Sequence, residues 1–253
     1  MSGHSKWATI KHKKGATDAK RGKLFNKLAR QVEVAAKGGG DPDMNATLRT
    51  AVQKAKSASM PNDAIERAIK RGSGEGSDGV VYETIMYEGY APGGVALLID
   101  VLTDNRNRIS SDVRQIFTKL GGSMAEPGAV GWQFSRKGVI IVDGEGADED
   151  ELMMAALEAG AEDMKPTGVG FQVTTEPSPV FDVKTSLEEA GFTVQSADSP
   201  MMAENLIDVT DVSDAKAILK IVEALEDNDD VQDVFSNFDL SDELLAELGE
   251  ADE

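Results

Sequence analysis

The chain has 253 residues and a mass of 26.9 kDa, enough for about two or three domains. It contains no cysteine, which excludes disulfides, thiolate metal sites and cysteine nucleophiles, and no apolar run reaches the roughly 18 residues of a membrane span. Its net charge of −19, taken alone, argues against nucleic acid as a partner.

The chain opens with a basic arm and a helix. Residues 1–19 lack apolar periodicity and are rich in Lys, Ser, Thr and Gly, which predicts a mobile or loosely docked arm. From Lys20 onward, apolar residues recur at helical spacing, and the glycine run that begins at Gly38 ends the pattern.

Two more short helices are predicted next. Asp41 is expected to cap the second helix, with Pro42 in its first position. The third is predicted to run from Pro61 to Gly72, and residues 72–79 (GSGEGSDG) have the composition of a linker. The start of the chain therefore predicts an arm joined to a small three-helix domain.

The pattern then changes to alternating strands and helices. Residues 82–88 and 95–102 predict two strands around a Pro-Gly-Gly turn, followed by a helix that starts at Ser110 or Ser111. These elements cannot close a core alone. A C-terminal helix and the strand 231–238 would supply the missing half, so we predict a discontinuous domain.

A second α+β unit is predicted between the two halves. Strands at 138–142, 171–175 and 192–196 alternate with two helices, the first at 152–159. The predicted fold class is α+β, with an N-terminal three-helix domain followed by two small α+β sandwich domains, one inserted in the other. The predicted domains are 1–79, 80–130 with 208–253, and 131–207. Sequential domains are the alternative.

Charge is distributed very unevenly along the chain. Up to Arg71 there are 16 Lys and Arg against 6 Asp and Glu, a net charge of +10, whereas the remainder carries 10 against 39, a net charge of −29. Residues 239–253 add seven acids and no base and predict a solvated tail. The asymmetry predicts an anion-binding head joined to an acidic body that faces solvent or proteins.

The basic head is suited to phosphate groups. Its first 30 residues hold nine cations and one acid, Asp18. On a helix, four of the cations fall within about 80° of one another, opposite the apolar face, while Arg21 lies in the apolar arc. A solvated face is the ordinary alternative, and contacts with phosphates would make binding depend steeply on salt. The nine cations are Lys6, Lys11, Lys13, Lys14, Lys20, Arg21, Lys23, Lys27 and Arg30.

Two further features of the basic segments leave alternatives open. Trp7 lies among the lysines, where it would either stack on an unpaired base or anchor the arm to the helices. Arg106, Arg108 and Arg114 surround a predicted helix N-terminus, which suits phosphate, but internal pairing with Asp104 and Asp112 is the alternative. A membrane surface would also attract a basic helix, although its apolar face is expected to pack in the bundle.

Enzyme motifs find no support in the sequence. The glycines of the linker match a dinucleotide-binding spacing, but a helix precedes them and a strand follows, the reverse of what that loop requires. The two histidines, His4 and His12, both lie in the arm. Acidic clusters at 148–151 and 227–230 leave a metal-dependent hydrolase as a remote alternative, and they are interpreted more simply as a helix start and a loop.

Three long segments closely resemble the YebC/PmpR family. They are GHSKWATIKHKKGATDAKRGKLFNKLARQ near the start, SMPNDAIERAIKRGSGE at 59–75, and YEGYAPGGVALLIDVLTDNRNRISSDVRQIF at 87–117. The resemblance covers nearly the whole chain. It implies three domains, one of them inserted in another, and a non-enzymatic protein. Bacterial members are described as probable DNA-binding transcriptional regulators, and other members act in translation, some on proline-rich sequences.

The residues to which the resemblance assigns a function lie mainly in the opening motif. The resemblance implies nucleic-acid contacts at Lys6, Trp7, Lys11, His12, Lys13, Lys14, Lys20, Arg21 and Lys23, and also at Arg106 and Arg108. Small departures, such as AIERAI at 64–69 where NIERAI is usual, touch none of these positions.

The sequence thus predicts a non-enzymatic regulator of gene expression, with no cofactor and no metal. Nucleic acid is the expected partner of the head, as DNA or as ribosomal or transfer RNA, and ribosomal or transcription proteins are the expected partners of the acidic body. A pure protein-interaction module is a further alternative. Because no Arg- and Ser-rich presequence precedes the opening motif, we expect a bacterial cytoplasmic protein.

Overall fold

A computed structural model describes residues 18–74, 81–168, 170–241, 244, 247 and 248. It divides into two compact units. One comprises Gln133–Glu204, and the other comprises the residues up to Trp132 together with those from Asn205 onward. The larger unit contains two separate hydrophobic cores, one among helices and one between helices and a sheet.

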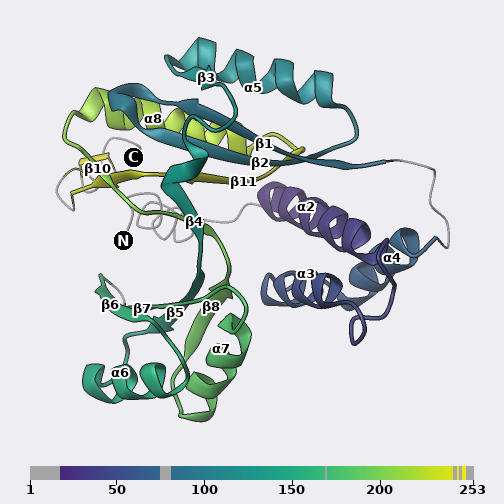
Figure 1. Cartoon of the computed structure of the whole chain (residues 1–253), viewed down its shortest axis with the longest axis vertical. Coiled ribbons are helices and arrows are strands. Elements are labelled where there is room, and N and C mark those ends of the chain that lie inside the picture. The colour runs from purple at the N-terminus through teal and green to yellow at the C-terminus, as the bar shows by residue number, and fades with distance from the viewer. Residues whose placement is uncertain (1–17, 75–80, 169, 242–243, 245–246, 249–253) are drawn as a thin grey trace. The chain divides into compact units, whose positions relative to one another are not determined.

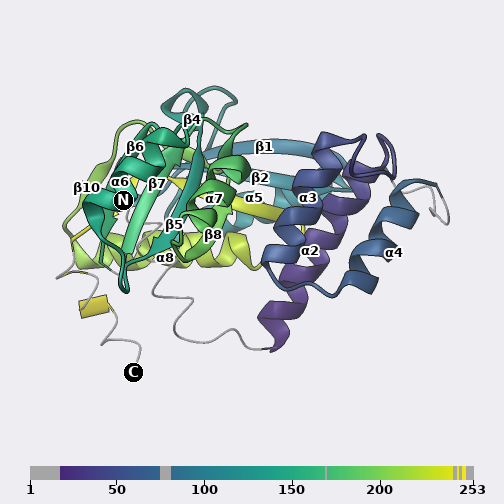
Figure 2. The ribbon, with the colours of Figure 1, turned by 90° about the horizontal axis from the view of Figure 1, so that it is seen from below.

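Three helices form the N-terminal part of the larger unit: α2 (Asp18–Ala36), α3 (Ala46–Ser57) and α4 (Asn62–Gly72), which lie together in Figures 1 and 2. Their apolar stripes meet in one core. Its fully or nearly fully buried members include Leu28, Val32, Leu48, Val52 and Ile65. Helix α4 approaches α2 so closely that a Cβ at Gly72 would overlap the carbonyl oxygen of Glu33.

The predicted start of α3 is wrong. Residues 41–44 form a turn, in which the Asp41 side chain accepts the N–H of Asp43 at 3.0 Å. The cap is Asn45, whose Oδ1 accepts the N–H of Leu48 at 3.1 Å while its Nδ2 donates to the carbonyls of Ala35 and Gly39. Asn45 therefore caps α3 and fastens it to the end of α2.

The rest of the larger unit is built on a four-stranded antiparallel sheet in the order β11-β2-β1-β3. The strands are β1 (Glu83–Tyr90), β2 (Ala96–Thr103), β3 (Ser123–Ala125) and β11 (Val231–Ser236), and the short helix η1 (Pro92–Gly94) connects β1 to β2. Helices α5 (Arg106–Leu120) and α8 (Val212–Glu226) pack against each other and share a core with alternate residues of β2. A parallel pair, β10 (Ile207–Val209) and β12 (Phe238–Leu240), completes this part.

The predicted start of α5 is also wrong. The helix begins at Arg106 rather than near Ser110, and Asn105 is its cap, accepting the N–H of Arg108 at 3.1 Å. The Thr103 hydroxyl in turn accepts the N–H of Asn105. One of the backbone donors expected to attract phosphate is therefore already used by a side chain.

The end of the chain is not wholly the solvated tail that its charge predicts. Leu240, Leu244 and Leu248 are 1%, 7% and 4% exposed and join the core beneath the sheet. The acidic end of the chain therefore contributes buried leucines to this core.

The smaller unit has its own antiparallel sheet in the order β6-β7-β5-β8. Its strands are β5 (Gly138–Asp143), β6 (Asp163–Thr167), β7 (Gly170–Thr175) and β8 (Val194–Asp198). Helices α6 (Glu149–Glu158) and α7 (Val180–Glu189) contribute Leu152, Val183 and Leu187 to its core. The remaining elements are η2 (Gly131–Gln133), β4 (Phe134–Arg136) and β9 (Met201–Ala203), with β4 and β9 paired.

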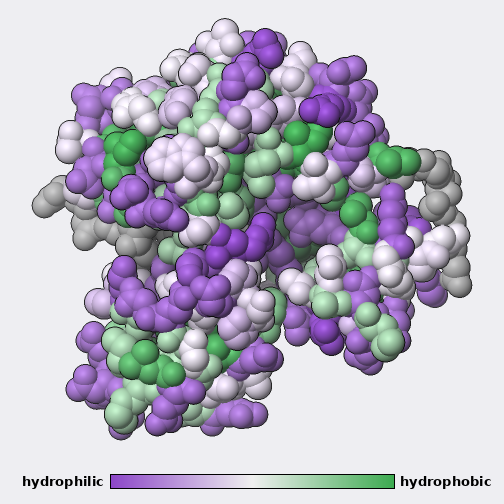
Figure 3. All heavy atoms as spheres, in the orientation of Figure 1, coloured by the Kyte–Doolittle hydropathy of each residue, from purple (hydrophilic) through white to green (hydrophobic). Residues whose placement is uncertain are grey.

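This architecture confirms the predicted fold class, α+β with an N-terminal helical domain. On the face shown in Figure 3, hydrophilic side chains predominate and the apolar ones form small, separate patches. No helix in the described part of the chain is long and apolar enough to cross a membrane.

Candidate nucleic-acid interface

Three of the four α2 cations that the sequence predicts to share one face, Lys23, Lys27 and Arg30, contact the chain's own acidic segment at the end of α8 and in the acidic turn before β11. Lys23 Nζ donates to the carbonyl of Asp227 at 3.2 Å and lies 3.5 Å from its Oδ1. One turn later, Lys27 Nζ donates to the carbonyl of Glu226 at 2.6 Å. The basic face of α2 therefore already holds an anionic and carbonyl-rich segment.

Arg30 ends this row and is the most extensively bonded member. Its Nη1 donates to the carbonyl of Leu102 at 3.2 Å, to the carbonyl of Asp229 at 3.1 Å and to Asp230 Oδ1 at 2.9 Å. The Arg30 guanidinium also lies 5.3 Å from the centre of the Tyr82 ring. Arg30 thus connects helix α2 to the end of β2, to the residues just before β11 and to the residue just before β1.

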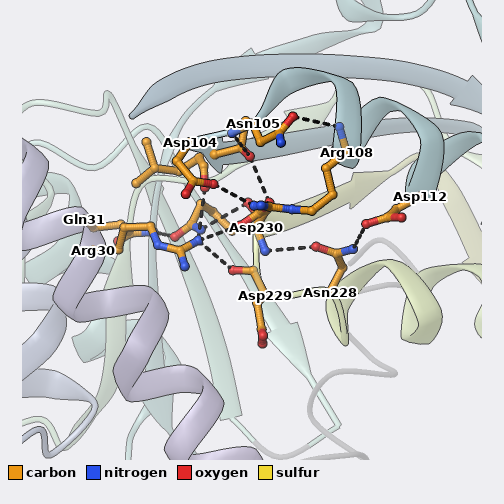
Figure 4. Close-up of polar contacts among 12 residues, drawn as sticks. Arg30, Gln31, Asp104, Asn105, Arg108, Asp112, Asn228, Asp229 and Asp230 are labelled. Carbon is orange, nitrogen blue, oxygen red and sulfur yellow. Dashed lines mark hydrogen bonds and ion pairs between the residues drawn. The ribbon is translucent and has the colours of Figure 1, made fainter. Parts of the chain in front are cut away.

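Asp230 is the centre of the polar cluster drawn in Figure 4. It is 5% exposed, and its Oδ2 accepts hydrogen bonds from Thr103 Oγ1 at 2.8 Å and from Arg108 Nη2 at 2.6 Å. Arg108 Nη2 also contacts Asp104 Oδ1 at 2.7 Å. One carboxylate therefore forms ion pairs with two arginines, Arg30 and Arg108, that come from different helices.

The electrostatics of this cluster favour its charged forms. Burial alone would raise the pKa of Asp230, but the hydrogen bonds from Arg108 and Thr103 and the charges of both arginines outweigh burial and hold that pKa below its ordinary range. The same bonds to Asp230 and Asp104 raise the pKa of Arg108. Lys27 behaves oppositely, because burial lowers its pKa more than Glu226, Asp233 and Asp229 raise it.

A pocket of about 320 Å³ opens beside these contacts. Five of its lining residues come from α2, and the others come from the end of α4, from the residue that precedes β1 and from the acidic turn. The lining residues are Lys23, Asn26, Lys27, Arg30, Glu33, Arg71, Tyr82 and Asp229. Arg71 Nε donates to Glu33 Oε2 at 2.9 Å across its wall.

The predicted contact residues fall into three groups. Lys6, Trp7, Lys11, His12, Lys13 and Lys14 lie outside the described residues. Lys20 belongs to the first turn of α2, and its side chain is also outside the described part. Lys23, Lys27 and Arg30 are brought together, and Arg108 joins them through Asp230.

Two predicted cations stand apart from this cluster. Arg21 is exposed, with its guanidinium 5.4 Å from the centre of the Phe25 ring. Arg106 is exposed, and its side chain forms no hydrogen bond or ion pair with the described part of the chain. The alternative of internal pairing holds for Arg108, which pairs with Asp104 as predicted and also with Asp230. Asp112 instead accepts a hydrogen bond from Asn228.

Sequence reasoning missed several members of the site. Arg71 and Tyr82 flank the predicted linker, and nothing in their local pattern marks them as neighbours of α2. The acids at 227–230 have the local pattern of a loop, and the available signal was their charge, complementary to that of α2. Among the described residues, no group of three or more His, Cys, Asp or Glu side chains could hold a metal ion.

The comparisons with known proteins match this chain to one family of proteins. A family model described as "TACO1/YebC protein N-terminal domain" matches residues 5–75, and one described as "TACO1/YebC second and third domain" matches residues 82–238. A protein from Rubrobacter xylanophilus is 57% identical over 98% of this chain and 99% of its own length. One from Beutenbergia cavernae is 55% identical over 99% and 100%. Both are named "Probable transcriptional regulatory protein".

A solved structure is similar as well. The crystal structure of a conserved hypothetical protein from Aquifex aeolicus superposes with a TM-score of 0.80. The two sequences are 44% identical, and the match covers 90% of this chain and 94% of the other. The likeness therefore extends over both compact units.

Proposed function

Since the chain belongs to the TACO1/YebC family, whose similar bacterial members are named as probable regulators of transcription, we propose that it is a non-enzymatic regulator of gene expression that binds DNA through its basic head. The resemblance expected from the sequence is confirmed at the level of the family. In the proposed arrangement, the residues up to Arg71 contact phosphates, and the acidic body faces solvent or partner proteins in a bacterial cytoplasm.

The observation that carries the proposal is the confinement of net positive charge to the head. A net charge of +10 up to Arg71, in a chain whose total is −19, concentrates the anion-binding capacity in less than a third of the sequence. Each phosphate that a Lys or Arg neutralises releases condensed counterions, so a cluster of such contacts supplies most of the affinity of a nonspecific complex.

The contacts of α2 indicate how phosphates would be held. Lys23, Lys27 and Arg30 are spaced to follow one edge of the helix, and each already binds carbonyl or carboxylate oxygens. Phosphate oxygens are acceptors of the same kind with a larger charge. A nucleic acid would extend this row of oxygens from the acidic turn outward along the head.

A second candidate function is that of a translation factor that binds ribosomal or transfer RNA and eases stalled synthesis of proline-rich sequences. The charge of the body favours this alternative. After Arg71 the chain carries −29, which bare duplex DNA repels, whereas the basic proteins that surround ribosomal RNA attract it.

The test is crosslinking of the protein to nucleic acid in living cells, followed by sequencing of what is attached. The arm variant replaces Lys6, Lys11, Lys13 and Lys14 by Gln, and a matched control replaces Lys165, Lys184, Lys216 and Lys220 by Gln. We expect promoter-proximal DNA with the wild type and the control, and at least about tenfold less with the arm variant, because four phosphate contacts are lost.

Each other outcome has a definite meaning. Recovery of ribosomal or transfer RNA in place of DNA would replace the first candidate by the second. Equal recovery with the arm variant and the wild type would remove the arm from the interface. If the wild type recovers no nucleic acid, both candidates fail.

A further inference from the structure

The pocket beside α2 combines three features that act on different parts of a nucleotide. Its volume of about 320 Å³ is at the lower end of those that hold small ligands, which are about 300–1,000 Å³. Four cations line it against two carboxylates, one of which, Glu33, is already paired with Arg71. The side chains of Asn26 and Tyr82 complete the wall with an amide and an aromatic ring.

The cations retain hydrogen-bond donors that the described residues do not use. Lys27 is half-buried and uses one of its three N–H groups, on the carbonyl of Glu226. All three hydrogen bonds of Arg30 come from Nη1, which leaves Nε and Nη2 without one in the described part of the chain. Arg71 bonds Glu33 through Nε alone, and its side chain is 44% exposed. A phosphate in the pocket would meet spare donors from more than one direction.

Tyr82 supplies the surface that a phosphate alone does not need. Its ring lines the pocket, with the guanidinium of Arg30 at 5.3 Å and the ammonium of Lys37 at 5.7 Å from the ring centre. Unpaired bases stack on aromatic rings and on arginine planes, and every base has such a face. A paired base inside a duplex does not offer its face in this way.

We propose that this pocket binds one nucleoside phosphate unit, with the phosphate on Lys27, Arg30 and Arg71 and the base against Tyr82. The unit is a residue of an unpaired strand or a free mononucleotide. As a contact of an unpaired strand, the inference rests on the proposed nucleic-acid-binding function, which it narrows. Asp229, from the acidic turn, lines the pocket and offsets part of the positive charge of the four cations there.

The test measures binding of a fluorescein-labelled single strand of about 12 nucleotides and of the same strand in a duplex. Binding of AMP is measured both by competition with the strand and directly by calorimetric titration. The variants are Tyr82→Ala, Tyr82→Phe and Arg71→Gln. The matched control is Arg67→Gln, because Arg67 lies one turn earlier on α4, is 65% exposed and forms a similar ion pair, with Asp63 at 2.9 Å. Circular dichroism checks that each variant is folded.

We expect Tyr82→Ala and Arg71→Gln each to weaken single-strand binding about tenfold, with Tyr82→Phe and Arg67→Gln within about twofold of the wild type. Duplex binding should change little, since the arm is retained. AMP should displace the strand from the wild type, and about tenfold less effectively from Tyr82→Ala. AMP binding that depends on Tyr82, without any effect of the variants on the strand, would identify a free nucleotide as the ligand.

Other results would overturn the pocket inference. If the wild type binds strand and duplex and the variants change neither strand nor AMP binding, the pocket inference fails while the proposed function stands. It fails likewise if Arg67→Gln weakens binding as much as Arg71→Gln, or if the duplex loses as much affinity as the strand. If the wild type binds neither strand nor duplex, the proposed function fails instead, and the dependence of AMP binding on Tyr82 decides the pocket alone.

Discussion

Asp230 shows how much one residue can hold in place. Its carboxylate pairs with two arginines and accepts a hydrogen bond from the Thr103 hydroxyl at the end of β2. It is also the last residue of the acidic turn before β11. An exposed ion pair contributes little to stability, but a nearly buried carboxylate with several charge-assisted bonds contributes more. The attachment of α2 to the sheet therefore depends strongly on this side chain.

We expect Asp230→Asn to lower the free energy of unfolding by about 1–3 kcal/mol, because hydrogen bonds to a charged group are lost and Arg30 loses its carboxylate partner, whereas Arg108 keeps its pair with Asp104. Asp63→Asn is the control, since its pair with Arg67 is exposed and its loss should cost less than about 0.5 kcal/mol. Urea denaturation measures both variants, and equal costs would contradict the argument.

The wild type and Asp230→Asn should also respond differently to acid. Folding lowers the pKa of Asp230, so its contribution to stability is complete above the pKa of the unfolded chain and is lost as the pH falls through the lower folded value. The difference between the wild type and Asp230→Asn should therefore shrink below about pH 4. A difference that stays constant down to about pH 2 would show that the carboxylate charge is not its cause.

At the scale of elements, periodicity predicts where helices and strands lie, and long-range contacts decide where they begin. The spacing of Leu28, Val32 and Ala36 is a local property and predicts α2 correctly. Asn45 prevails over Asp41 as the cap of α3 because its amide also donates to the carbonyl of Ala35, at the end of α2, and to that of Gly39, just beyond it. Such a partner is fixed only when both helices are packed, so sequence alone could not select it.

The candidate site, too, is predictable from local sequence only in part. The cationic edge of α2 follows from helical geometry, whereas its partners lie far away along the chain, as the separation of 199 positions between Lys27 and Glu226 shows. The pocket needs Arg71 and Tyr82 as well, from a helix end and a residue just before a strand. No local pattern encodes such a meeting of four segments.

The acidic turn makes a prediction of its own. Asp227→Asn with Asp229→Asn should tighten nucleic-acid binding about threefold to tenfold at low salt, because two negative charges beside the cations of α2 are removed. Glu149→Gln with Asp150→Asn, in the first turn of α6, makes the same change in net charge and should have a smaller effect. Fluorescence anisotropy measures both, and equal gains would indicate that only total charge matters.

At the scale of the whole molecule, the two compact units are expected to unfold as separate steps, because each has a core of its own. Leu152→Ala removes a fully buried side chain from the smaller unit and should cost about 2–5 kcal/mol there. Calorimetry should then show one unfolding transition shifted to a lower midpoint temperature, with the other transitions unchanged. Leu157→Ala, on the same helix but 54% exposed, should shift none. A single transition that moves as a whole would contradict this independence.

The bonds from α2 to the acidic turn have a consequence for how this protein can change over generations. Lys23, Lys27 and Arg30 each donate to at least one main-chain carbonyl, at residues 227, 226 and 229 respectively. A carbonyl persists whichever amino acid occupies its position. Relatives could therefore exchange the side chains at positions 227 and 229, and with them the charge beside the pocket, while Asp230 and these carbonyls keep the helix attached at the same place. Selection can thus adjust how strongly the head holds an anion without rebuilding the fold.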